Sequence, residues 1–202
     1  MVLKIHAENP QPRLIKQVTE CLKEGGIIVY PTDTIYGLGC DILQPKAVER
    51  ICKIKNIDPQ KAQLSFICSD LSHLSEYTKS IDTPLYRILK RYLPGPYTFI
   101  LPSSKLVPKI LQSKKNTIGL RVPDNVICQH ILEAMGNPIL STSLPGEMVE
   151  DYCDPEIIYE KFKHLVDFVI DGGPGGMIPS TIVDCTSDEW TVTRQGLGEW
   201  AA

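Results

Sequence analysis

The chain has 202 residues, of which 43% are apolar and 22% are charged, and its formal net charge is −3. This many apolar side chains can fill a core, so the composition excludes a disordered chain and fits one domain spanning residues 1–202. The small negative net charge excludes a surface that is basic all round, but it leaves room for one local basic face.

The start of the chain, MVLKIHAENP, contains no long apolar stretch, and we expect neither a secretory signal nor a membrane-spanning segment. The seven cysteines are scattered, odd in number and never spaced as Cys-x-x-Cys, which is typical of reduced thiols rather than a disulfide framework. We therefore expect a cytoplasmic protein without a membrane partner, in which most cysteines fill the core.

Helical and strand patterns alternate along the chain, as is typical of an α/β fold. The first expected elements are a helix over 13–24, a strand over 27–30, a polar loop over 31–39 and a helix that begins at Pro45. We next expect a strand over 64–68, a helix begun by Thr83 as a hydroxyl cap, strands over 97–101 and 117–122, a helix capped by Asp124, and strands over 138–142, 166–170, 181–184 and 191–194. Connections of mixed length predict a mixed sheet.

The segment 31–39, PTDTIYGLG, combines hydroxyls, a carboxylate, a phenol and two glycines directly after a buried strand. Glycines allow backbone N–H groups to approach a ligand closely, and threonine hydroxyls bind phosphate or carboxylate oxygens. An ordinary polar turn explains the pattern equally well, because no generic phosphate-loop spacing is present.

Two further segments carry cations that have two interpretations each. Lys53 and Lys55 lie at the end of a helix, where they either cap it in solvent or bind phosphate. Arg121 lies near the end of an apolar strand, so it pairs either with a protein carboxylate or with a ligand anion.

Hydroxyl groups gather at two strand ends. The run from Ser141 to Ser143 follows one strand, and Ser180 precedes another after the glycine-rich segment 172–176, which is either a lid or a surface turn. Arg194 lies near the end of the last strand, where a solvated side chain is the default.

No nucleophile or metal-binding pattern is present, so we assign no catalytic residue and no metal ligand. An enzyme of this kind would act by positioning and charge neutralisation.

Taken in order, these segments resemble the YrdC/YciO superfamily. The resemblance rests on YPTDTIYGLG (30–39), KIKN (53–56), TIGLRVPDN (117–125), PILSTS (138–143), DGG (171–173), STIVD (180–184) and TRQG (193–196). It implies a single domain with a twisted, open mixed sheet, flanking helices and a concave electropositive cleft. Members that are threonylcarbamoyl-AMP synthases join threonine, bicarbonate and ATP, usually with Mg²⁺ and without a tightly bound cofactor, for the t6A modification of tRNA.

The resemblance also implies roles for eight residues. Contacts to the threonine part are implied for Thr34, Arg121 and Ser180, and contacts to the nucleotide, as ATP or its AMP moiety, are implied for Lys55, Thr117, Ser141, Ser143 and Arg194.

Two positions depart from the synthase pattern. Synthases carry a Lys-x-Arg and Ser-x-Asn tetrad, whereas this chain has Ile57 in place of the arginine and Pro145 in place of the asparagine. The segment IKNIDPQK (54–61) resembles the YciO branch instead. We therefore expect weak synthase activity, since a phosphate-contacting donor typically contributes about 10²–10³ in rate.

Two alternatives remain open: hydrolysis of threonylcarbamoyl-AMP in the same cleft, and binding of double-stranded RNA or tRNA there. Lysines could follow an RNA backbone, but with 7% aromatic residues no platform for stacked bases stands out. The lysines fall into two clusters: Lys53, Lys55 and Lys61, and Lys105, Lys109, Lys114 and Lys115.

Overall fold

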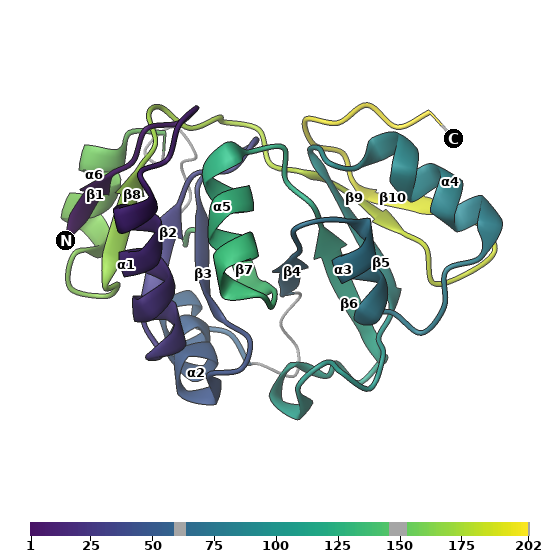
Figure 1. Ribbon diagram of the computed structural model, residues 1–202. Coiled ribbons are helices and arrows are strands. Elements are labelled where there is room, and N and C mark those ends of the chain that lie inside the picture. The colour runs from purple at the N-terminus through teal and green to yellow at the C-terminus, as the bar shows by residue number, and fades with distance from the viewer. Residues whose placement is uncertain (59–63, 146–152, 202) are drawn as a thin grey trace.

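The computed structural model describes residues 1–58, 64–145 and 153–201 (Figure 1). Its strands are β1 (Val2–Lys4), β2 (Ile27–Tyr30), β3 (Gly37–Asp41), β4 (Ser65–Ile67), β5 (Tyr97–Pro102), β6 (Thr117–Arg121), β7 (Ile139–Ser143), β8 (Phe168–Asp171), β9 (Thr181–Asp184) and β10 (Thr191–Arg194). Its helices are α1 (Pro12–Lys23), α2 (Pro45–Lys55), α3 (Leu71–Glu76), α4 (Thr83–Tyr92), α5 (Val126–Met135), α6 (Pro155–Phe162) and the 3₁₀ turn η1 (Lys109–Leu111).

Within the described residues the strands form one twisted sheet in the order β1-β8-β2-β3-β7-β4-β6-β5-β9-β10. The pairs β1/β8, β2/β8, β4/β6 and β5/β9 are parallel, and the other neighbours are antiparallel. The mixed α/β sheet expected from the sequence is therefore confirmed.

Side chains of the central strands alternate between two apolar clusters on opposite faces of the sheet, as the period of a strand requires. In β2, Ile28 and Tyr30 pack with α1 and α5, which lie side by side across β2, β3 and β7 (Figure 1). Ile27 and Val29 point to the other face and join a cluster that includes residues of α2, α4 and α6. Since both faces are covered there, all four residues of β2 are buried.

The loop expected over 31–39 is wrong in its second half, because β3 begins at Gly37 and pairs with both β2 and β7. Its glycines hid the strand, since glycine is usually depleted in strands. They serve close packing here: a Cβ on Gly39 would lie 2.8 Å from Tyr30 Cε1 and 2.9 Å from Leu140 O.

Both helix caps expected from the sequence are displaced by one residue. Asp82, not Thr83, caps α4 by accepting a hydrogen bond from Leu85 N at 2.9 Å, and Thr83 is the first helical residue. Asn125, not Asp124, caps α5 through Cys128 N at 3.0 Å. Aspartate and asparagine are equally good caps, so pattern alone did not select between neighbours. β1, α3 and α6 were not expected from the sequence.

None of the seven cysteines forms a disulfide, and burial raises the pKa of several of the thiols, among them Cys185, whose pKa rises to about 12. Most of them fill the core as expected: Cys40, Cys52, Cys68, Cys128 and Cys185 are buried. No helix in the described part of the chain is long and apolar enough to cross a membrane.

We predict that Gly39→Ala destabilises the protein by about 1–3 kcal/mol, because its methyl group would overlap the Tyr30 ring and the Leu140 carbonyl. Urea unfolding measures this difference. Leu43→Ala, at a side chain that is 60% exposed two residues after β3, is the control and should change stability by less than about 0.5 kcal/mol. Equal stabilities of the two variants would contradict the packing described for β3.

Candidate functional site

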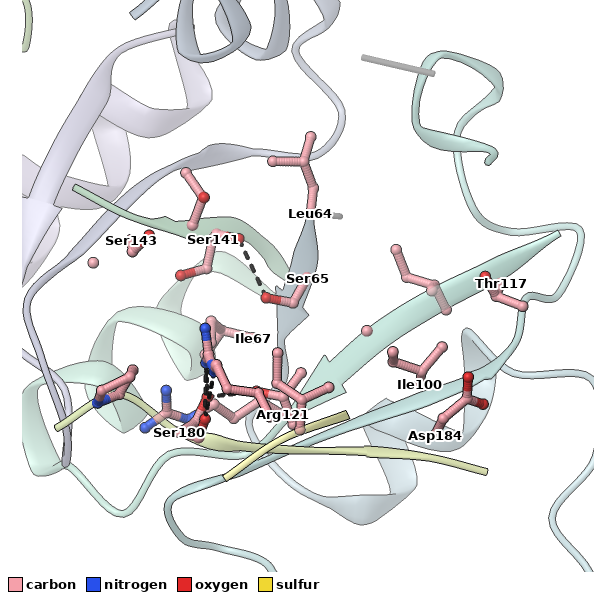
Figure 2. A pocket seen from close by; sticks show the side chains of 18 of the residues that line it. Leu64, Ser65, Ile67, Ile100, Thr117, Arg121, Ser141, Ser143, Ser180 and Asp184 are labelled. Carbon is pink, nitrogen blue, oxygen red and sulfur yellow. Dashed lines mark hydrogen bonds between the residues drawn. The ribbon is translucent and has the colours of Figure 1, made fainter. Parts of the chain in front are cut away.

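A cavity of about 270 Å³ opens on the face of the sheet that α1 and α5 cover at β2, β3 and β7. Residues two apart on a strand point to the same face of the sheet. Ser141 therefore shares its face with Ile139, and Ser65 shares its face with Ile67, and both isoleucines pack in the cluster of α1 and α5. Beyond the helices, the same face continues across β4, β6, β5 and β9 (Figure 2). The cavity is lined by polar residues from all of these strands and by an apolar wall.

At one end of the cavity, Arg121 forms a buried ion pair with Asp33. Its Nη2 donates to the Asp33 carboxylate and to Thr34 Oγ1 at 2.8 Å, and the two charged side chains are 8% and 10% exposed. Among the described residues, Arg121 Nε and Asp33 Oδ2 are buried without a partner. The first interpretation of Arg121, pairing with a protein carboxylate, therefore applies. One buried donor of its guanidinium group, Nε, has no partner in the described residues and is left for a ligand.

A second guanidinium group lies close to this pair. Arg194 donates through Nε and Nη2 to Ser180 O at 3.1 and 2.8 Å, and through Nη2 to Ser180 Oγ at 3.1 Å. Ser180 Oγ also shares a hydrogen bond of 2.9 Å with Thr98 Oγ1. Burial, and then the nearby positive charge of Arg121, lower the pKa of Arg194. Arg194 is exposed, as expected by default, but its guanidinium group also binds Ser180 at the start of β9.

Lys55, the last residue of α2, reaches the end of β7. Its Nζ donates to Ser143 O at 2.9 Å and lies 3.3 Å from Ser143 Oγ, and burial lowers the pKa of its ammonium group. Lys55 is thus not a solvated helix cap. Half of the expected tetrad, the lysine and the serine, is assembled in direct contact.

Between these two ends, Ser141 is held by buried neighbours. Tyr30 OH donates to Ser141 Oγ at 2.6 Å, and Ser65 Oγ lies 3.3 Å from Ser141 O (Figure 2). Burial strongly raises the pKa of the Tyr30 phenol, which keeps its proton. Since Ser141 Oγ accepts from Tyr30, its own hydroxyl proton remains available for a further acceptor.

The far end of the cavity is more apolar. Thr117 begins β6, and its backbone N–H donates to Ser113 Oγ at 3.1 Å. Asp184 ends β9 on the same side (Figure 2). The wall around them is formed by Ile100, Leu111, Ile118 and Ile182.

The structure brings the eight residues expected from the sequence together, while their roles stay predictions. Thr34 and Lys55 do not line the cavity but bind lining residues, Arg121 and Ser143. The six that line it are Thr117, Arg121, Ser141, Ser143, Ser180 and Arg194.

Sequence reasoning missed several neighbours of these residues. Asp33 was visible as the only carboxylate of the segment 31–39, but the partner of Arg121 cannot be found without the fold. Strand alternation would have placed Ser65 and Thr98 on the same face as Ile67 and Ile100. Asp184 lay in the STIVD motif without an assigned role.

The glycine-rich segment 172–176 is bound to the loop that carries Asp33 and Thr34. Gly176 N donates to Thr34 O at 2.7 Å, and Tyr36 OH donates to Gly173 O at 2.7 Å. A Cβ on Gly176 would lie 2.4 Å from Thr34 O, so this contact requires glycine. The segment is a turn packed on the site.

Two further features concern metals and RNA. Residues 1–58, 64–145 and 153–201 contain no group of three or more His, Cys, Asp or Glu placed to hold a metal ion. Of the lysines considered for RNA, Lys61 lies outside the described residues. The others are exposed except Lys55, which binds Ser143.

Comparison with known proteins agrees with this fold. A family model described as "Telomere recombination", covering Sua5, YciO and YrdC proteins, matches residues 20–196. The chain is 48% identical to the uncharacterized protein YciO of Escherichia coli over 96% of this chain and 95% of that protein. The crystal structure of E. coli YciO superimposes with a TM-score of 0.92, covering 98% of this chain and 97% of that one.

Synthases of the same family are more distant. A threonylcarbamoyl-AMP synthase of Chromobacterium violaceum is 34% identical over 88% of this chain and 92% of that protein. Sua5 of Pyrococcus abyssi, crystallised with L-threonine, is 27% identical with a TM-score of 0.86, and the match covers 97% of this chain but 57% of Sua5. The chain therefore belongs to the Sua5/YciO/YrdC family, with YciO among its near relatives, as its motifs indicate.

We predict that Asp33→Ala destabilises the protein by roughly 3–5 kcal/mol, because it leaves the Arg121 guanidinium buried without its counter-charge. Lys16→Ala is the matched control: it breaks the Lys16–Glu20 pair, whose side chains are 76% and 60% exposed, and should cost at most about 0.5 kcal/mol. Both are measured by urea unfolding. If Asp33→Ala were as mild as Lys16→Ala, the ion pair would not be buried as described.

Proposed function

We propose that the cavity binds an adenine nucleotide together with a threonylcarbamoyl-type group, and that the protein has weak threonylcarbamoyl-AMP synthase-like activity linked to t6A modification of tRNA. The observation that carries this proposal is the separation of two cationic groups along one cavity, Arg121 with Arg194 and Lys55 with Ser143. Because such a molecule carries a carboxylate at one end and a phosphate further along, it needs cations at both places.

The Arg121 end suits the amino-acid part. Two guanidinium groups lie at this end, and among the described residues only Arg121 is paired with a carboxylate, that of Asp33, so this end has an excess positive charge. The unused Arg121 Nε adds a donor. Support also comes from P. abyssi Sua5, which was crystallised with L-threonine. The same donors would hold the substrate carboxylate by charge-assisted hydrogen bonds.

The Lys55 end suits phosphate. The Lys55 ammonium group, the Ser143 hydroxyl and the free proton of Ser141 would bind phosphate oxygens and orient the nucleotide. A cavity of about 270 Å³ is close to the volume range of small-ligand sites and is far too small for an RNA duplex, which would have to lie outside it. Nucleotide binding is therefore the better supported function.

The residues present do not form a magnesium site. Asp184 is the single carboxylate among the described lining residues, and it lies on the side away from Arg121 (Figure 2). Mg²⁺ usually needs one or two carboxylates next to substrate phosphates. Any Mg²⁺ would therefore arrive with ATP. The seven cysteines, none of which forms a disulfide, support a reducing compartment such as the cytoplasm.

Weak turnover follows from two side chains. Ile57 packs against the core cluster that contains residues of α2, and neither Ile57 nor Pro145 has a side-chain donor for a phosphate oxygen. Charge that develops on a departing pyrophosphate would be less well stabilised, while groups that bind the ground state are kept. We therefore expect the protein to keep its affinity for the ligand while its turnover is low.

We predict that the double variant Ile57→Arg with Pro145→Asn raises the rate of pyrophosphate release by about tenfold or more, with threonine, bicarbonate and ATP present. The added donors act mainly on the transition state, so ligand affinity should change less than turnover. The single variant Leu43→Arg adds the same charge at an exposed apolar residue outside the cavity and should not change the rate.

Each variant is first compared with the wild type by circular dichroism, because Ile57 also packs on the core. A wild-type rate equal to that of a synthase with the complete tetrad would contradict the expected weakness. A folded double variant with no gain in rate would contradict the role given to these two positions.

A further inference from the structure

Asp184 places a carboxylate in the cavity, at the end away from the arginines. β9 pairs with β5 so that Asp184 lies beside Ile100, and Ser180 precedes the first residue of the same strand. Four residues of extended chain separate Ser180 from Asp184, which is about 13 Å. Figure 2 shows Asp184 on the side of Thr117 and Ile100, with Arg121 and Ser180 on the other.

One oxygen of this carboxylate is fixed by the turn that follows β9. Asp184 Oδ1 accepts from Thr186 N at 2.9 Å and from Thr186 Oγ1 at 2.7 Å. Among the described residues, no side chain donates to Asp184 Oδ2, and Asp184 forms no salt bridge. The carboxylate is therefore oriented, with one acceptor oxygen unused.

The surroundings restrict what that oxygen can accept. The neighbouring wall of Ile100, Ile118 and Ile182 is apolar, and a carboxylate repels phosphate. Lys115 also lines the cavity, and its side chain is exposed to solvent. A partner for Asp184 therefore carries an N–H or O–H donor, and next to the apolar wall a flat, uncharged group with such donors fits, which describes the nucleoside part of a nucleotide.

We infer that Asp184 accepts a hydrogen bond from the nucleoside of the bound nucleotide and so determines which nucleosides the cavity takes. The inference rests on the proposed nucleotide site and extends it to a residue without an assigned role. Carboxylates accept hydrogen bonds from ribose hydroxyls in dinucleotide sites and from the exocyclic amines of bases. Either the ribose or the base of the nucleotide could therefore supply the donor. Thr186 is a positioning residue, because it holds the carboxylate.

The test is calorimetric titration of the wild-type protein with AMP, 2′-deoxy-AMP, 3′-deoxy-AMP and purine riboside 5′-monophosphate. Each analogue lacks one donor: a sugar hydroxyl in the deoxy compounds and the exocyclic amine in the last. We expect at least one of them to bind about tenfold or more weakly than AMP, because a site built to accept a hydrogen bond rejects a ligand without the donor. The analogue that loses affinity identifies the source.

The key variant is Asp184→Asn, which keeps an oxygen for Thr186 but presents an NH₂ group in place of the second oxygen. The wild-type preference for AMP over that analogue should fall to within about twofold. Asp184→Ala, which removes both oxygens, should do the same. Asp188→Ala, an exposed aspartate of the same loop that does not line the cavity, is the control and should keep the wild-type preference.

Two results would overturn the inference while AMP still binds: equal affinity of the wild type for all four ligands, or an undiminished preference in both Asp184 variants. Absence of AMP binding to the wild type would instead overturn the proposed nucleotide site, and this inference with it.

Discussion

The buried ion pair between Arg121 and Asp33 joins parts of the protein that the sheet keeps apart. Arg121 ends β6, Asp33 lies in the loop after β2, and three strands separate β2 from β6. The loop is fixed from a second side, because Gly176 donates to Thr34 O. Burying two charges costs solvation energy, which their attraction repays only while both partners are present. One end of the cavity therefore depends on this pair.

From that fixed end, charge changes along the cavity in a definite order. Arg121 and Arg194 lie at the loop end, Lys55 with Ser143 lies at the end of β7, and Asp184 lies at the far end beside apolar side chains. A ligand with a uniform charge, such as an RNA backbone, does not match this order. A molecule with a carboxylate, a phosphate and an uncharged donor-bearing group does. The polarity of the cavity thus suggests both the class of ligand and its direction.

The sequence predicted much of the fold because its elements follow simple periods. Strand β2 and helix α1 were found from apolar patterns, and most site motifs stand out because they directly precede, begin or end a strand, while that of Lys55 ends a helix. The sequence did not reveal β3, since glycine is usually depleted in strands, and only the fold shows that the Tyr30 ring occupies the space of a side chain at Gly37 and Gly39. The Asp33–Arg121 pair also could not be predicted from the sequence, because its partners are 88 residues apart and only the sheet order brings them together.

The central claim is that one cavity binds both halves of an acyl-adenylate at once, and calorimetric titration with threonylcarbamoyl-AMP tests it most directly. Because each half would meet its own cations, the whole molecule should bind at one site per chain and more tightly than AMP or L-threonine alone. A tenfold gain over AMP corresponds to about 1.4 kcal/mol from the threonylcarbamoyl group. An affinity for threonylcarbamoyl-AMP no greater than that for AMP would contradict the account, because the Arg121 end would then contribute nothing to binding.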